Sequence, residues 1–176
     1  KYNPFGAKKR EEYLKLQDPF CLFYLRFVEG KDSLSSNFWT NNITSQQIIS
    51  WRGLAFENLC FRHIKQIKNT LGISGVETSE SVWFQKGTED NSGSQIDMLI
   101  YRKDNVVNMC EIKFYNDDYE VDNQYMRLLM RRRNSLEGIL PKRVSIQSTL
   151  ITTFGLKYNK YSNSFNNTIV LDDLFS

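Results

Sequence analysis

Two stretches of this chain, residues 95–101 and 106–115, alternate with a period of two and are largely apolar on both faces. Strands with that pattern normally lie in the interior of a sheet that is covered on both sides. The polar sequence Lys103-Asp104-Asn105 between them is typical of a hairpin turn. We therefore expect two antiparallel neighbours at the centre of a layered domain.

The segments around this hairpin predict helices and further strands. Apolar residues recur at helical spacing after a capping-box pattern at Thr44 and Gln47, and Gly72 is suited to end that long helix. The other elements are expected as strands at 82–85, 144–152 and 169–170, a loop at 86–94 and a helix at 122–136. The order of helix, strands, helix and strand predicts an α/β fold.

The N-terminal part of the chain predicts a smaller helical element. Asp18 is suited to cap a short aromatic helix from Phe20 to Glu29, and Gly30 can close that helix in a left-handed conformation. Before it, residues 3–6 are expected to form a turn and residues 13–16 a short strand. Residues 31–43 are polar and are expected to connect this helix to the next one.

Composition bounds the class of protein. The 176 residues suffice for one domain with a buried core, and the net charge of +3 means that any DNA binding must be local. No apolar run approaches the roughly 18 residues of a membrane span, so no membrane association is expected. Cys21, Cys60 and Cys110 are odd in number and widely spaced, which argues against a disulfide framework and favours the reducing cytoplasm.

Three charged residues lie on the two central strands, where charges need a reason. If Arg102 pairs with Val106, the hairpin register places Asp97 opposite Glu111, with Cβ atoms about 4.5 to 5.5 Å apart. Two carboxylates at that distance repel each other, and a divalent cation held between them relieves the repulsion. Lys113 lies two residues beyond Glu111 on the same face and offers a second relief.

A cation at this pair has a chemical use. Mg²⁺ can polarise a phosphodiester, ready a water for attack and stabilise the leaving oxygen, while Lys113 orients that water. The alternative is structural: Lys113 forms a salt bridge with Asp97 or Glu111, or the three residues only mark an exposed strand end. Spacing alone leaves both interpretations open.

The order of these residues resembles that of the PD-(D/E)XK nuclease superfamily. Asp97 and the triplet Glu111-Ile112-Lys113 stand on adjacent strands, after a helix that carries Glu57. Ile96 occupies the position where the superfamily has proline. The resemblance to the C-terminal region of prokaryotic DEXX-box, AAA-type ATPases is narrower, and it is carried by Trp51 to Glu57, Gln95 to Asp97, Cys110 to Phe114 and Leu150 to Leu156.

The resemblance implies a restriction-endonuclease-like mixed β-sheet flanked by helices, with an N-terminal helical segment. It implies that Asp97 and Glu111 hold Mg²⁺ or Mn²⁺, that Lys113 assists the water and that Glu57 supports them. The expected activity is metal-dependent hydrolysis of phosphodiester bonds in DNA. The alternative is a non-catalytic module that binds DNA or a protein partner.

The resemblance also implies how the chain is divided. Residues 1–17 are expected to be the remnant of a preceding winged-helix element, 18–43 a helical linker segment and 44–176 the nuclease-like domain. No G-x-x-x-x-G-K-[ST] phosphate loop occurs in the chain, so the ATPase module is expected in a part of the protein that precedes it. Whether the chain forms a homo-oligomer is left open.

A cluster of arginines follows the acidic pair. Arg127 and Arg131 are four residues apart and share one face of the expected helix, and Arg133 lies close to them. Guanidinium groups in this arrangement can bind the phosphates of DNA without reading its bases. The alternative is a solvated helix face.

Overall fold

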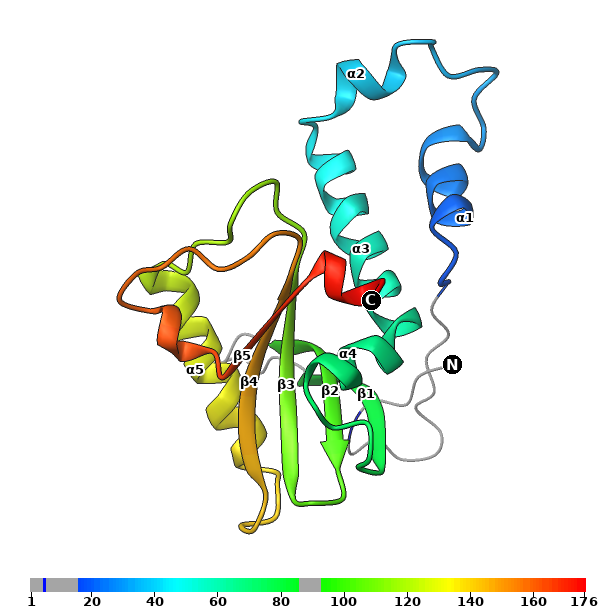
Figure 1. Ribbon diagram of the computed structural model, residues 1–176. Coiled ribbons are helices and arrows are strands. Elements are labelled where there is room, and N and C mark those ends of the chain that lie inside the picture. The colour runs from blue at the N-terminus through cyan, green and yellow to red at the C-terminus, as the bar shows by residue number, and fades with distance from the viewer. Residues whose placement is uncertain (1–4, 6–15, 86–92) are drawn as a thin grey trace.

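The computed structural model describes residues 5, 16–85 and 93–176 (Figure 1). A five-stranded sheet of strand order β1-β2-β3-β4-β5 forms its centre, and helices flank the sheet. The chain is therefore an α/β protein with a mixed sheet, as the sequence predicted. None of the helices in the described ranges combines the length and the apolar character that crossing a membrane requires.

The sheet combines an antiparallel and a parallel half. β1 (Thr78–Gln85) and β2 (Ser94–Arg102) are antiparallel, as are β2 and β3 (Val106–Lys113). β4 (Ser145–Thr152) is parallel to β3, and β5 (Asn167–Val170) is parallel to β4. A parallel pair needs a long crossover, and α5 (Asn123–Glu137) supplies it between β3 and β4.

Each face of the sheet is covered by different helices. On one face, α3 (Gln46–Arg62) and α4 (Ile64–Thr70) pack Phe56, Cys60 and Ile67 against side chains of β2 and β3. On the other face, α5 packs Leu129 and Leu136 against the sheet. β3 is consequently buried on both sides, which explains why its sequence is apolar on both faces.

The hairpin between β2 and β3 has the predicted register. Tyr101 pairs with Val107 and Met98 pairs with Cys110, which is the alignment that follows from pairing Arg102 with Val106. Asn105 in the turn adopts a positive φ of 64°, a conformation that asparagine tolerates better than most residues.

The prediction of one long helix from Thr44 to Leu71 was wrong in two details. The helix begins after Ser45, whose hydroxyl accepts the N–H of Ile48, and not after Thr44. It is also interrupted at His63, where φ is −107° and ψ is 27°, so α3 and α4 are separate helices. No proline or glycine stands at that point, so the sequence carries no local signal for the break. Gly72 ends α4 with a φ of +68°, as expected.

The N-terminal helical segment follows its capping signals closely. Asp18 accepts the N–H of Cys21 at 2.7 Å, and Gly30 has a φ of +74°. The segment consists of α1 (Pro19–Phe23), the π-helical η1 (Tyr24–Val28) and α2 (Phe38–Asn42). Residues 29–37 connect η1 to α2, so the predicted connection of 31–43 contains a short helix that its polar sequence did not indicate.

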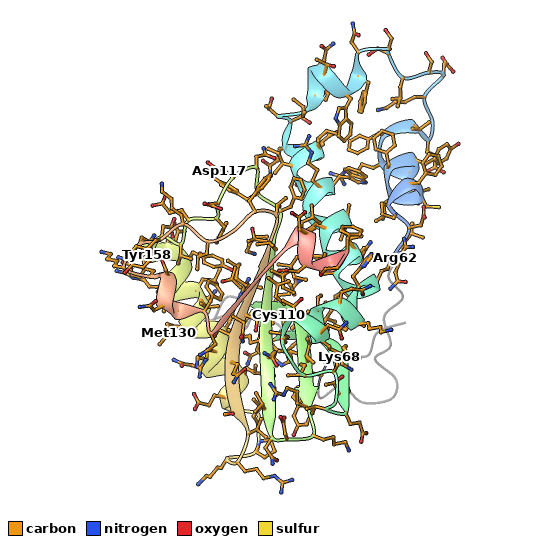
Figure 2. The ribbon with its side chains drawn as sticks, viewed as in Figure 1. Arg62, Lys68, Cys110, Asp117, Met130 and Tyr158 are labelled. Atoms are coloured by element: carbon orange, nitrogen blue, oxygen red, sulfur yellow. The ribbon has the colours of Figure 1, made fainter. Side chains whose placement is uncertain are left out.

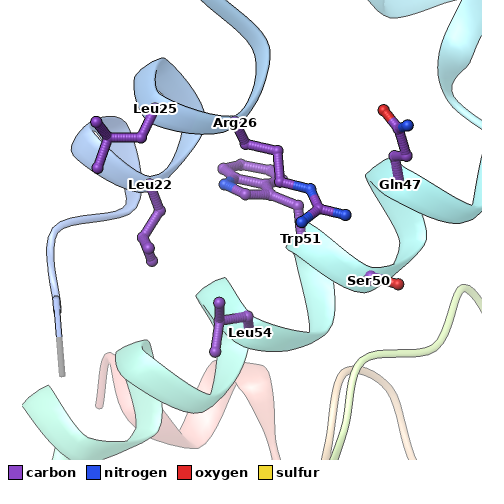
Figure 3. Close-up of a pocket in the computed structure, with 7 residues that line it drawn as sticks. All are labelled: Leu22, Leu25, Arg26, Gln47, Ser50, Trp51 and Leu54. Carbon is purple, nitrogen blue, oxygen red and sulfur yellow. The ribbon is translucent and has the colours of Figure 1, made fainter. Parts of the chain in front are cut away.

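Aromatic packing attaches this segment to α3. The indole of Trp51 on α3 contacts the rings of Phe23, Phe27 and Trp39 at centroid distances of 5.6, 6.4 and 5.9 Å. A groove of about 640 Å³ remains between the segment and α3 and is lined by Leu22, Leu25, Arg26, Gln47, Ser50, Trp51 and Leu54 (Figure 3).

The remaining elements are the two short 3₁₀ helices η2 (Ser162–Ser164) and η3 (Leu171–Leu174). The turn expected at 3–6, except for Phe5, and the strand expected at 13–16, except for Leu16, lie outside the described residues, as do most of the loop expected at 86–94 and of the winged-helix remnant expected at 1–17.

Candidate functional site

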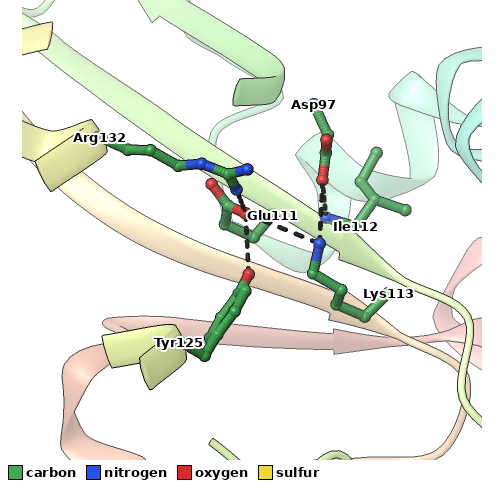
Figure 4. A network of polar contacts seen from close by, with 6 residues as sticks. All are labelled: Asp97, Glu111, Ile112, Lys113, Tyr125 and Arg132. Carbon is green, nitrogen blue, oxygen red and sulfur yellow. Dashed lines mark hydrogen bonds and ion pairs between the residues drawn. The ribbon is translucent and has the colours of Figure 1, made fainter. Parts of the chain in front are cut away.

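The side chains of Asp97, Glu111 and Lys113 converge at one end of β2 and β3 (Figure 4). Lys113 Nζ lies 3.7 Å from Asp97 Oδ2 and 3.9 Å from Glu111 Oε2. The lysine side chain is 28% exposed, whereas Asp97 is nearly buried and Glu111 is fully buried. The two buried carboxylates thus share the ammonium group of Lys113, whose side chain reaches solvent.

A β-bulge interrupts the pairing of β1 with β2 at Asp97 and Met98. Ser81 pairs with Leu99 and Trp83 pairs with Ile96, so β2 has one more residue than β1 between these pairs. Bulges of this kind are frequent beside functional sites, where they re-aim a side chain. Uninterrupted alternation would place Ile96 and Leu99 on opposite faces, but across the bulge both pack in the same core cluster as Trp83.

The Asp97 carboxylate also takes the place of a backbone acceptor for the N–H of Ile112. The described pairing of β2 with β3 ends at Met98 and Cys110, and beyond it the N–H of Ile112 donates to Asp97 Oδ2 at 2.9 Å. This hydrogen bond satisfies a buried donor that has left the strand ladder. It uses Oδ2, the oxygen that also faces Lys113.

Glu111 is held from the side of α5. Tyr125 donates its hydroxyl to Glu111 Oε2 at 2.8 Å, and the guanidinium of Arg132 donates to the same oxygen. Within the described structure, Glu111 Oε1 is buried and has no hydrogen-bond partner. One oxygen of this carboxylate is therefore fully engaged and the other is an unsatisfied acceptor.

Burial dominates the ionisation of Glu111. It raises the pKa of the carboxyl group, and the neighbouring charge of Asp97 raises it further, against the opposing effects of Arg132, Lys113 and the Tyr125 hydroxyl. Burial, together with Glu111, also raises the pKa of the Tyr125 phenol, so the phenol stays protonated and can donate. The site therefore resists carrying two negative charges unless positive charge is supplied.

Tyr125 and Arg132 were not predicted as members of the site. The two are seven residues apart, which is about two helical turns, and so they share a face with the buried Leu129 and Leu136. Two polar residues at the same helical spacing as the buried Leu129 and Leu136 are the signal that could have identified them.

Glu57 lies on α3, on the side of the sheet opposite to α5. It is half-buried, one turn before the buried Cys60. Burial raises the pKa of the Cys60 thiol, and the charges of Cys110, Glu57 and Asp97 raise it further. The helix that carries Glu57 packs Phe56 and Cys60 on β2 and β3, on the face of the sheet opposite to the helix that holds Glu111.

The three predicted phosphate-binding arginines have different surroundings. Arg127 and Arg131 are exposed on α5 and line a groove of about 550 Å³ together with Tyr119, Asp122, Gln124, Tyr125 and Leu128. Arg133 instead donates to the carbonyl oxygen of Ile146 at 2.9 Å and to Ser148 Oγ at 3.3 Å. Its guanidinium is directed to β4, away from that groove.

Comparison with known proteins assigns no family to this chain. No family model matches it, and no curated protein matches it. Among solved structures, it is similar to the crystal structure of AF1548, described as a protein of unknown function, with a TM-score of 0.43 and 18% sequence identity. The match covers 66% of this chain. It covers 64% of the AF1548 chain, which is less than two thirds of the length of AF1548.

The carboxylate pair meets the minimum requirement of a Mg²⁺ site. Mg²⁺ is usually bound through one or two carboxylates, with waters and substrate phosphates as the remaining ligands. The unsatisfied Oε1 of Glu111 is an oxygen that could coordinate such an ion. Within the described residues, no three His, Cys, Asp or Glu side chains gather as metal donors, and Asp97 and Glu111 are the two carboxylates that lie within 4 Å of Lys113 Nζ there.

Proposed function

We propose that this chain is a nuclease domain that hydrolyses phosphodiester bonds of DNA with Mg²⁺ or Mn²⁺. The observation that carries the proposal is the convergence of Asp97, Glu111 and Lys113, with Lys113 Nζ within 4 Å of both carboxylates. We further propose that the domain forms the C-terminal part of a cytoplasmic AAA-type ATPase. That part of the proposal rests on the sequence resemblance.

In this proposal each residue has a separate task. Asp97 and Glu111 hold the cation, which when bound polarises the phosphodiester and lowers the pKa of a water. Lys113 reaches solvent and places its positive charge where the water and the phosphate meet. Tyr125 and Arg132 hold the Glu111 carboxylate in one orientation, and Glu57 adds negative charge from the α3 side.

One observation favours a non-catalytic alternative, in which the chain binds DNA or a protein partner. Arg132 and Tyr125 already saturate Glu111 Oε2, and Arg132 neutralises its charge. A buried carboxylate that is paired in this way needs no metal ion. In this alternative the acidic pair is a structural ion-pair network, and the DNA contacts are made elsewhere.

Nuclease assays on duplex, branched and single-stranded DNA, with Mg²⁺ or Mn²⁺, distinguish the two functions. Asp97→Asn and Lys113→Ala should both abolish cleavage, because the first removes a metal ligand and the second removes the charge beside the water. Lys103→Ala is a matched control, since Lys103 is 70% exposed at the opposite end of the same hairpin. It should leave cleavage unchanged.

The same assays can reject the proposal. The binding alternative would be established by two results together. Neither this chain nor the longer ATPase that carries it would cleave DNA with either metal, and Asp97→Asn would leave the affinity for DNA unchanged. If Asp97→Asn still cleaves DNA, the reaction is performed by a contaminating enzyme or by a different site on this protein.

A further inference from the structure

Two aromatic side chains stand exposed beside the candidate site, where the parallel strands β3 and β4 end. Lys113 pairs with Thr152 at the last position of that ladder, and the same register reaches Tyr115 and Phe154 two residues later. The N–H of Tyr115 donates to Thr153 Oγ1 at 3.1 Å, so the two segments that follow β3 and β4 are still adjacent there. Tyr115 is 50% exposed and Phe154 is 58% exposed.

The loops that carry these two rings are joined to each other. Tyr119 and Leu156 form a parallel bridge, in which the N–H of Tyr119 donates to the Gly155 carbonyl at 2.8 Å and the N–H of Lys157 donates to the Tyr119 carbonyl at 2.9 Å. Figure 2 labels Asp117 on the first loop and Tyr158 on the second. Because the backbone is already ordered, little conformational entropy is lost when a ligand covers the rings.

A row of packed rings connects Tyr115 to the acidic pair. Its ring contacts Tyr119 at a centroid distance of 5.8 Å, and Tyr119 contacts Tyr125 at 5.6 Å, both edge to face. Tyr125 then donates to Glu111. The exposed ring of Tyr115 is therefore the outer end of an aromatic row that begins at the candidate metal ligands.

Charge divides this region into two parts. The loop around Tyr115 carries the exposed carboxylates of Asp117 and Asp118, which disfavour phosphate groups there. The groove that Tyr119 lines also contains Arg127 and Arg131, whose two positive charges outnumber the one carboxylate of Asp122 in its lining and favour phosphate groups. A strand of DNA satisfies both preferences if its backbone follows the arginines and its bases turn towards the exposed rings.

We propose that Tyr115 and Phe154 form a stacking platform for unpaired DNA bases next to the scissile phosphate. The substrates of the proposed nuclease, on which this inference rests, would then be single strands or the unpaired ends and branches of duplexes. Every base has a face that stacks on an aromatic ring, so the platform is tolerant of sequence. A blunt duplex, whose bases are already stacked on each other, offers few such faces.

Binding without cleavage tests the platform independently of the nuclease reaction. In metal-free buffer, the affinity of the chain for a labelled single strand should fall about five-fold or more in Tyr115→Ala and in Phe154→Ala. Affinity for a blunt duplex of the same sequence should change much less. A 2-aminopurine base in the strand should be quenched by the wild-type chain, and this quenching should be lost in the double variant.

Two matched variants make the test specific. Phe20→Ala removes a ring that is 72% exposed on α1 and should change neither affinity nor quenching. Tyr115→Phe keeps the ring and should behave as the wild type. Because stacking releases no counterions, the slope of affinity against salt should stay the same in Tyr115→Ala.

Several outcomes would overturn the platform: no binding of single strands by the wild-type chain, unchanged affinity in the double variant, or equal weakening of the blunt duplex. A protein-binding role for these rings would give one of those results. The proposed nuclease function fails separately, through absent cleavage, and strong quenching that depends on Tyr115 would leave the platform standing in that case.

Discussion

The carboxylate of Asp97 accepts the backbone N–H of Ile112 at 2.9 Å, just beyond the point where the described pairing of β2 and β3 ends. The same oxygen lies 3.7 Å from Lys113 Nζ. Asp97 therefore has a structural task, to satisfy a buried donor, in addition to any task as a metal ligand. Substitutions at this position must separate the two.

Replacing Asp97 with alanine should destabilise the protein more than replacing it with asparagine. Alanine leaves the buried N–H of Ile112 without an acceptor, which costs about 1–3 kcal/mol, whereas the asparagine side-chain oxygen can still accept it. Urea unfolding measures the difference. Equal stabilities for the two variants would mean that water satisfies this N–H, and Asp97→Asn is the better variant for activity assays.

Mg²⁺ should raise the melting temperature of the wild-type chain, because an ion that binds only the folded state stabilises it by mass action. At a concentration 100 times the dissociation constant the gain is about 2.7 kcal/mol. The shift should vanish in Asp97→Asn and persist in Lys113→Ala. A shift of equal size in all three proteins would place the ion elsewhere on the surface.

Arg132→Gln should destabilise the protein by about 3 kcal/mol or more at neutral pH, because it leaves the buried Glu111 carboxylate without its closest countercharge. If the site binds Mg²⁺, the ion can replace that charge and should stabilise Arg132→Gln more than the wild type. The melting temperatures of both proteins, with and without Mg²⁺, measure this.

Arg133→Gln is the control for that experiment. The Arg133 guanidinium donates to the carbonyl oxygen of Ile146, so its loss should cost less and should be insensitive to Mg²⁺. Equal Mg²⁺ stabilisation of the wild type and Arg132→Gln would show that Arg132 and the ion do not compete for Glu111.

The raised pKa of Glu111 predicts a pH dependence with a defined sign. Because the folded state holds the proton of Glu111 more tightly than the unfolded state, this group stabilises the fold below its ordinary pKa of 4.5, and that contribution is lost as the pH rises through the raised value. In metal-free buffer, the unfolding free energy of the wild type relative to Glu111→Gln should therefore decrease with rising pH.

Other ionisations cancel in that comparison. Asp18 and Asp104 have lowered pKa values and lose stabilising contributions as the pH falls, but they are present in both proteins. Urea unfolding at a series of pH values measures the difference. A difference that stays constant, or grows as the pH rises, would show that the Glu111 carboxyl is ionised at little cost in the folded protein.

The double variant Arg127→Ala/Arg131→Ala should weaken DNA binding equally for all sequences and reduce the salt dependence. Each lost phosphate contact lowers the slope of log affinity against log salt concentration by about one. Lys142→Ala/Arg143→Ala is the matched control, since this exposed pair precedes β4 at the opposite end of the sheet. Equal effects in both variants would indicate non-specific attraction.

The sequence by itself determined the local elements and the central hairpin. The alternation of residues 95–101 and 106–115, with the turn between them, predicted the observed register of β2 and β3. Asp18, Gly30 and Gly72 marked helix ends correctly because capping depends on a few neighbouring residues. The α/β order followed from these local signals.

Only the tertiary structure decided how the candidate site is built. The bulge beside Asp97, which brings Ile96 to the same face as Leu99, appears when β2 pairs with β1, a contact that alternation alone cannot reveal. Three consecutive arginines look alike in sequence, yet Arg132 pairs with Glu111 while Arg133 turns to β4. Each helical residue is rotated by about 100° from the previous one, so the packing of α5 on the sheet determines which of them reaches the buried carboxylate.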